Sequence, residues 1–80
     1  MIYILNEQIM NGTVTMKILT KGIKANTFDE AIERLKQFPN FSFARNIEQD
    51  KDSFSYCIPP KDNEVLFVIG LMKSEPLEIM

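Results

Sequence analysis

The chain of 80 residues lacks histidine and tryptophan and has a single cysteine, Cys57. Histidine is the commonest general acid–base residue and the commonest metal ligand, so its absence removes the residue on which most catalytic and metal sites depend. A lone cysteine cannot form an internal disulfide, which agrees with a reducing compartment. Because no histidine could activate its thiol, Cys57 is interpreted as a small strand residue.

Glycine is also scarce. The three glycines lie far apart, and none forms the Gly-x-Gly pattern of a phosphate-binding loop. The paired acids, Asp50 with Asp52 and Asp62 with Glu64, fall in predicted turns, where acidic residues usually serve turn geometry and solubility. No loop has the twelve-residue calcium pattern. We therefore expect neither an enzyme nor a cofactor or metal.

Long apolar runs are missing too. The first ten residues have no basic region and too short an apolar stretch for a signal peptide, and nothing approaches the roughly 20 apolar residues of a membrane span. The sequence thus predicts a cytoplasmic protein with no membrane partner.

The net charge of the chain is −2. Residues 1–24 carry three lysines against one glutamate, whereas residues 48–64 carry five acids against two lysines. Neither end has the basic excess of a duplex-DNA binder, so nucleic acid is not expected.

The clearest signal that is present is an amphipathic helix over residues 27–38 (TFDEAIERLKQF). Thr27 and Glu30 have the spacing of a capping box, in which each side chain bonds a free backbone N–H of the first turn. The apolar residues from Phe28 to Phe38 fall on one face. Pro39 is expected to end the helix, and no other segment has a helical pattern.

Strands account for the rest of the chain. Ile2 to Met10 and Thr13 to Leu19 flank Asn11-Gly12, a strong hairpin signal. A two-residue turn there would pair Leu5 with Ile18, and would place on one face Leu5, Ile9, Val14, Met16 and Ile18. Further strands are predicted over 41–47, 53–58 and 65–72. The last is apolar at every position but Gly70, so we expect it to be the most buried.

These elements predict an α+β fold, β-β-α-β-β-β: a five-stranded antiparallel sheet with one amphipathic helix packed on one face. Eighty residues make a single domain, 1–80, and the Pro76-containing tail 73–80 is expected to be poorly ordered. A helix of about 12 residues is only about 18 Å long, so one sheet face should remain uncovered.

That uncovered face is the predicted interaction surface. Ile4 and Leu19 are expected to point outward on it, among small and mostly polar side chains: Gln8, Thr15, Lys17, Ser42, Ala44, Asn46, Ser53, Ser55 and Cys57. A plain solvated face is the common alternative in antiparallel sheets. Apolar groups on an uncovered face favour a partner or a dimer. The predicted partner-binding residues are Gln8, Thr15, Lys17, Lys21, Arg45 and Asn46.

One aromatic pattern has the spacing of a known RNA-binding strand. Phe41 and Phe43 alternate beside Arg45, as in the stacking strand of an RNA-recognition motif. The basic residue and glycine that should precede them are replaced by Pro39-Asn40, and the aromatics are needed as core. Core is the favoured interpretation. A weak single-strand binder that uses Lys17, Lys21 and Lys24 is kept as an alternative.

Residues 22–35 (GIKANTFDEAIERL) run from a strand through a polar cap into a helix. With the opening Tyr3-Ile4-Leu5-Asn6-Glu7, they resemble small phage and mobile-element proteins, in particular anti-CRISPR proteins that inhibit type I-F surveillance complexes. The resemblance covers the first half of the chain. It implies a non-enzymatic inhibitor that blocks the nucleic-acid site of a bacterial defence protein. The slightly acidic charge departs from that group, and no binding motif matches position by position.

The leading hypothesis is therefore a small non-enzymatic protein that occupies a surface of a larger bacterial protein or complex. Its contacts would come from the uncovered face or from the acidic stretch 48–64. The alternative of another class is a self-associating accessory or structural protein, a homodimer that uses the same face or the last strand.

Overall fold

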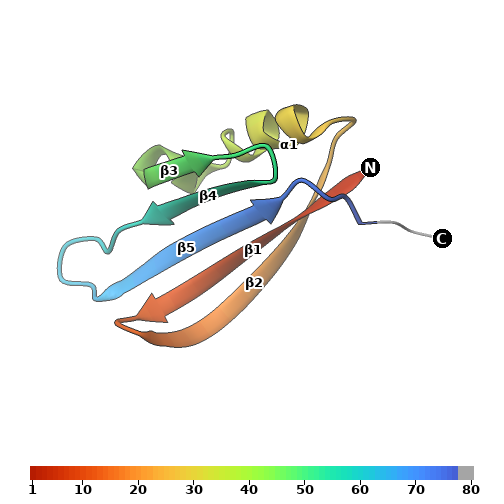
Figure 1. Ribbon diagram of the computed structural model, residues 1–80. Coiled ribbons are helices and arrows are strands. Elements are labelled where there is room, and N and C mark those ends of the chain that lie inside the picture. The colour runs from red at the N-terminus through yellow and green to blue at the C-terminus, as the bar shows by residue number, and fades with distance from the viewer. Residues whose placement is uncertain (78–80) are drawn as a thin grey trace.

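The computed structural model describes residues 1–77 and confirms the α+β fold (Figure 1). The strands are β1 (Ile2–Asn11), β2 (Val14–Lys24), β3 (Arg45–Gln49), β4 (Ser53–Ile58) and β5 (Leu66–Lys73). Helix α1 (Phe28–Leu35) and a 3-10 helix, η1 (Pro39–Phe43), lie between β2 and β3. Every paired neighbour in the sheet is antiparallel.

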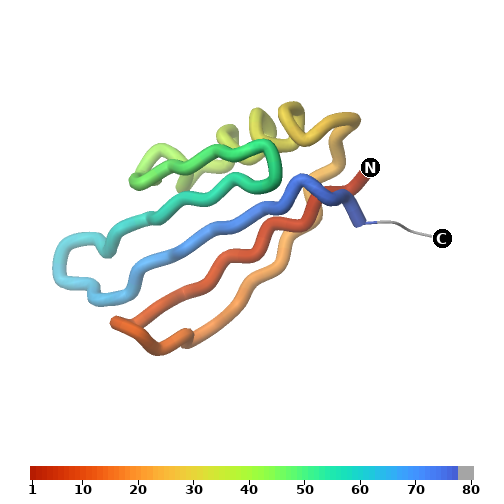
Figure 2. Tube along the Cα trace, viewed as in Figure 1, coloured from red at the N-terminus to blue at the C-terminus, as the bar shows by residue number. Residues whose placement is uncertain are grey.

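The sheet order is β2-β1-β5-β4-β3, so β5 is central although it comes last in the chain. Figure 2 shows β5 running between the first hairpin and β4. The tail predicted to be poorly ordered begins at residue 73. In the structure β5 extends to Lys73, and Leu77 forms a bridge with Ile2. Residues 78–80 of that tail lie outside the described residues.

Helix α1 begins where the capping pattern predicts. The Thr27 side chain accepts a hydrogen bond from the Glu30 backbone N–H at 3.1 Å. Glu30 reaches back one residue further than expected, to the Asn26 N–H at 3.2 Å. The helix ends at Leu35, before the predicted Phe38, and the chain turns into η1.

Helix η1 replaces the first half of the strand predicted over 41–47. Pro39 lies at its start, where the fixed φ of proline suits a helical turn. This 3-10 turn lets Phe41 pack edge-on against Tyr56, with ring centroids 5.3 Å apart. It also buries Ala44, which was expected on the uncovered face, and takes Ser42 out of the sheet.

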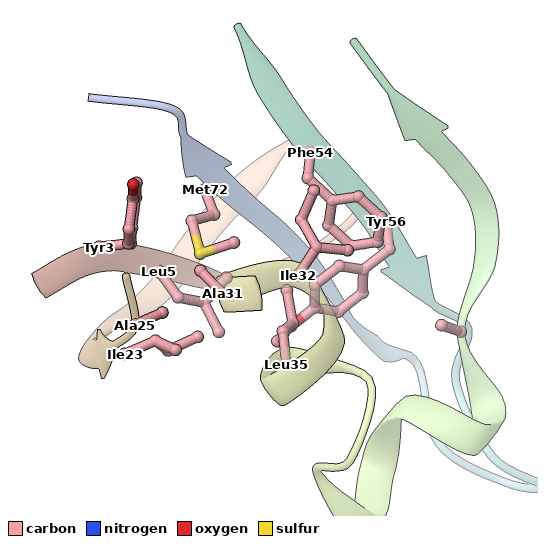
Figure 3. Packing of buried hydrophobic residues seen from close by; sticks show 11 residues of the cluster. Tyr3, Leu5, Ile23, Ala25, Ala31, Ile32, Leu35, Phe54, Tyr56 and Met72 are labelled. Atoms are coloured by element: carbon pink, nitrogen blue, oxygen red, sulfur yellow. The ribbon is translucent and has the colours of Figure 1, made fainter. Parts of the chain in front are cut away.

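The hydrophobic core lies between α1 and one end of the sheet (Figure 3). Side chains from α1, from the helix-facing sides of β1, β4 and β5, and from the end of β2 meet there: Tyr3, Leu5, Ile23, Ala31, Ile32, Leu35, Phe54, Tyr56 and Met72. Phe28 and Phe38 are partly buried against this cluster. The predicted apolar helix face is therefore the buried one.

The hairpin register differs from the prediction. Asn11 pairs with Val14, so Gly12 and Thr13 form the turn, and Gly12 alone has a positive φ, +59°. A register shift follows between Ile9 and Met10, and Leu5 pairs with Lys21 in place of Ile18. An odd shift moves side chains to the opposite face. Ile18 thus leaves the core face, while Leu19 pairs with Glu7 on it.

Strand β5 is central but is not the most buried strand. Gly70 and Met72 are buried, whereas Leu66, Ile69 and Leu71 are exposed. The physical reason is the short helix, which covers one face of β5 at one end only. The expectation that this strand is the most buried is therefore wrong. Both of its faces are apolar, but only one of them is covered.

Candidate functional site

The uncovered face carries an apolar area with no charged side chain. Paired residues on neighbouring strands share a face, so the register gives its rows across the sheet. The first is Thr15–Met10–Phe67, the second Ile18–Gln8–Ile69–Cys57, and the third Thr20–Asn6–Leu71–Ser55. We call these eleven residues the open face. In the described residues, the charged positions that adjoin the open face are Arg45 and Glu48 of β3 and Lys73, and Lys24 lies on the same side farther along β2.

A shallow groove of about 350 Å³ runs through the middle of the open face. Its walls are Ile18, Ile69 and Leu71, and its polar groups are the side-chain amides of Asn6 and Gln8. Thr20 donates a hydrogen bond to the Asn6 side-chain oxygen at 3.1 Å. The groove therefore combines apolar walls with amides that can donate a hydrogen bond to a bound partner or accept one from it.

The six residues predicted as contacts do not form one site. Gln8 and Thr15 lie on the open face, where Thr15 Oγ1 lies 3.2 Å from the Met10 sulfur. Lys17 and Lys21 pair with Ile9 and Leu5, which puts both on the helix side and corrects their placement on the uncovered face.

The remaining two, Arg45 and Asn46, lie on β3 at the far edge of the sheet. Arg45 pairs with Cys57 and borders the open face there. Asn46 has a φ of +53° and lies within a register shift. The apolar members Ile18, Ile69 and Leu71 were missed, because the sequence assigned Ile18 to the core and the last strand to the interior.

Buried charge is found on the helix side, at Glu7. Its carboxylate accepts a hydrogen bond from the Tyr56 hydroxyl at 3.3 Å, and the Lys21 ammonium lies 2.9 Å from its other oxygen. Lys21 is therefore the ionic partner of Oε1, which accepts no other hydrogen bond in the described residues. Lys21 also lies 5.2 Å from the centre of the Phe38 ring. Glu7 alternates with Leu5 and Ile9 along β1, so a charged group at this position of an apolar face needs a partner.

The surroundings of Tyr56 keep its hydroxyl protonated, so that it can donate the hydrogen bond to Glu7. Burial raises the pKa of its hydroxyl, and the negative charge and hydrogen bond of Glu7 raise this pKa further. Tyr56 therefore stays a neutral donor. Its ring lies directly over Gly70, where an added Cβ would come within 2.3 Å of Cζ. This cluster is structural, because its hydrogen bond and ion pair satisfy the charge and the polar groups of its own members, Glu7, Lys21 and Tyr56.

Hollows also lie away from the open face. A pocket of about 260 Å³ on the helix side lies beyond α1, with walls that include Leu19, Phe43 and Val68 and with charges of both signs at its rim. A wider, more open cleft of about 680 Å³ lies between the start of α1 and the β3–β4 turn. The carboxylates of Asp29 and Asp50 line it, but no group in it is buried without a partner among the described residues.

Within residues 1–77, no three histidine, cysteine or acidic side chains gather in a way that could hold a metal ion. In the same range, no helix has the length and apolar character needed to cross a membrane. Comparisons with protein families, curated proteins and solved structures found no match.

Proposed function

We propose that this chain is a non-enzymatic binding domain that occupies a surface of a larger protein through its open face. The observation that carries the proposal is the charge-free apolar face at the middle of the sheet, with Ile18 57% and Ile69 38% exposed. The centres of protein interfaces are depleted in charge, and a contiguous exposed apolar patch usually marks an interaction site.

The polar groups of the open face support a protein partner over a nucleic acid. A nucleic-acid surface needs cations to meet phosphates, and the three rows carry none. Asn6 and Gln8 supply hydrogen bonds within apolar surroundings, as in an interface that is apolar at its centre and specific in a few contacts. The narrower identity of the target, a bacterial defence complex, is supported only by the sequence resemblance.

The test is affinity capture from a lysate of the source organism with two matched variants. Ile69→Glu adds a charge to the open face, whereas Val65→Glu adds the same charge at an exposed position before β5. The proposal expects a stoichiometric partner that wild type and Val65→Glu retain and that Ile69→Glu loses. If all three proteins capture the same partner equally, the open face is not the binding surface.

A homodimer through the same face is the second candidate. An uncharged face meets no like-charge repulsion from a second copy of itself. Light scattering distinguishes the two candidates, since self-association would give a dimer mass that Ile69→Glu reduces to that of a monomer.

A further inference from the structure

Strand β2 is a long free edge of the sheet. It is the terminal strand in the sheet order, spans eleven residues, and pairs only with β1. In β2, Ile23 alone is buried, and Val14, Met16 and Ile18 are each 57–59% exposed. An edge strand presents unpaired N–H and C=O groups, to which another strand can pair. Figure 1 shows β2 at the border of the sheet, with its hairpin tip directed away from α1.

The charge of β2 limits what can pair with it. Lys17, Lys21 and Lys24 are its only charged residues, and all are basic. A second β2 would bring like charges together, which is unfavourable across a strand pair. The opposite edge, β3, spans only five residues, and a register shift with Asn46 at positive φ interrupts it. The register shift of β2 lies at its hairpin end, and its residues from Lys17 to Lys24 pair without interruption. Neither edge of a second copy therefore suits β2.

We infer that β2 is the docking edge for an extended, acidic segment of a partner protein, which adds to the sheet as a sixth strand. This inference rests on the proposed function and names the mode and chemistry of the contact. Such strand addition takes affinity from main-chain hydrogen bonds and specificity from alternate side chains. Lys17 and Lys24 form no ion pair in the described residues, whereas Lys21 is held by Glu7. Of the two, Lys17 lies on the same side of the strand as Lys21.

The alternation of β2 defines the pattern of the segment. On the helix side, β2 presents Lys17, Leu19 and Lys21, and on the other side Ile18 and Thr20. An added strand therefore needs acids four residues apart on its helix side and apolar residues on the alternate positions. The apolar row would continue the open face beyond Ile18, so the edge and the open face would form one continuous surface.

The probe is the peptide acetyl-Thr-Glu-Val-Thr-Val-Glu-Thr-amide, added to the ¹⁵N-labelled full chain and followed by NMR. The inference expects saturable shifts and slowed amide exchange along β2, with affinity that falls as salt rises. A control peptide with lysine in place of both glutamates, and one with proline in place of the central threonine, should not bind. Lys17→Glu should weaken binding at least about tenfold, the effect of about 1.4 kcal/mol. Lys51→Glu, in the turn beside the opposite edge, should leave it unchanged.

Several outcomes would overturn the inference: no saturable shift, equal binding of the lysine peptide, shifts confined to β3 or to the open face, or protection of β2 by a second copy without peptide. In the capture experiment, a partner lost by Ile69→Glu but kept by Lys17→Glu would preserve the proposed function and exclude the edge. Peptide binding at β2 with no captured partner would support β2 as a docking edge and count against the proposed function.

Discussion

Leu71 and Met72 are neighbours on β5 with very different surroundings. Met72 is fully buried beneath α1 beside Leu5 and Phe54, whereas Leu71 lies on the open face and is 37% exposed. Both residues are apolar, and both lie on the central strand. The difference arises because the single helix covers one face of one end of the sheet. Apolar character alone therefore does not locate the core of so small a domain.

The same comparison separates stability from binding. The covered end holds the contacts that fold the chain, and about 60–65% of the surface of the unfolded chain is all that a domain of this size buries. The open face holds apolar side chains that contribute little to the folded monomer. Substitutions on the two faces of β5 should thus have separable effects, and that separation can be tested.

The largest expected difference in the free energy of unfolding is that between the alanine variants of Met72 and Leu71. Met72→Ala should lower the free energy of unfolding by about 2–5 kcal/mol, because it leaves a cavity in the core. Leu71→Ala should cost about 1 kcal/mol or less, because its side chain contacts solvent on the open face. Urea unfolding followed by circular dichroism measures both values. Equal losses at low protein concentration would mean that the open face is covered in solution, which would favour the homodimer.

Local signals in the sequence predicted the elements better than their register. The cap at Thr27 and Glu30, the apolar stripe of α1 and the alternation of Phe54, Tyr56 and Ile58 each depend on neighbouring residues, so a single sequence is enough to find them. The hairpin register depends on which residues form the turn. Moving the turn from Asn11-Gly12 to Gly12-Thr13, with the register shift that follows, changed the face of Ile18.

The candidate site could be predicted only in part for the same reason. Gln8 and Thr15 were placed on the right face, and Lys17 and Lys21 on the wrong one. The contacts of Tyr56 with Glu7 and Gly70 join β4 and β5 to β1, which is distant in sequence from both, and no local pattern encodes such contacts. Long-range packing, which the sequence leaves open, determined these positions.

Gly70 tests how closely the covered face is packed. A Cβ there would lie 2.3 Å from the Tyr56 ring, so Gly70→Ala must displace the ring and weaken its hydrogen bond to Glu7. We expect a loss of about 1–3 kcal/mol, typical of an overpacked core. A double-mutant cycle with Tyr56→Leu measures the coupling. Additive losses would show that the ring does not limit this site.

The covered face should also give the stability of the chain a pH dependence that the open face does not. Because the pKa of Tyr56 is raised in the folded chain above its usual value of 10.0, the unfolded chain loses this proton first as pH rises. The stabilising contribution of the neutral hydroxyl is therefore fully present below pH 10 and falls as pH increases beyond that value. Tyr56→Phe removes the donor to Glu7 and should cost about 1–3 kcal/mol near neutral pH. Unfolding free energies of the two proteins should converge above pH 10, since all other titrating groups are shared. Curves that stay parallel would mean that Tyr56 ionises alike in both states and that its bond to Glu7 contributes no pH-dependent stability.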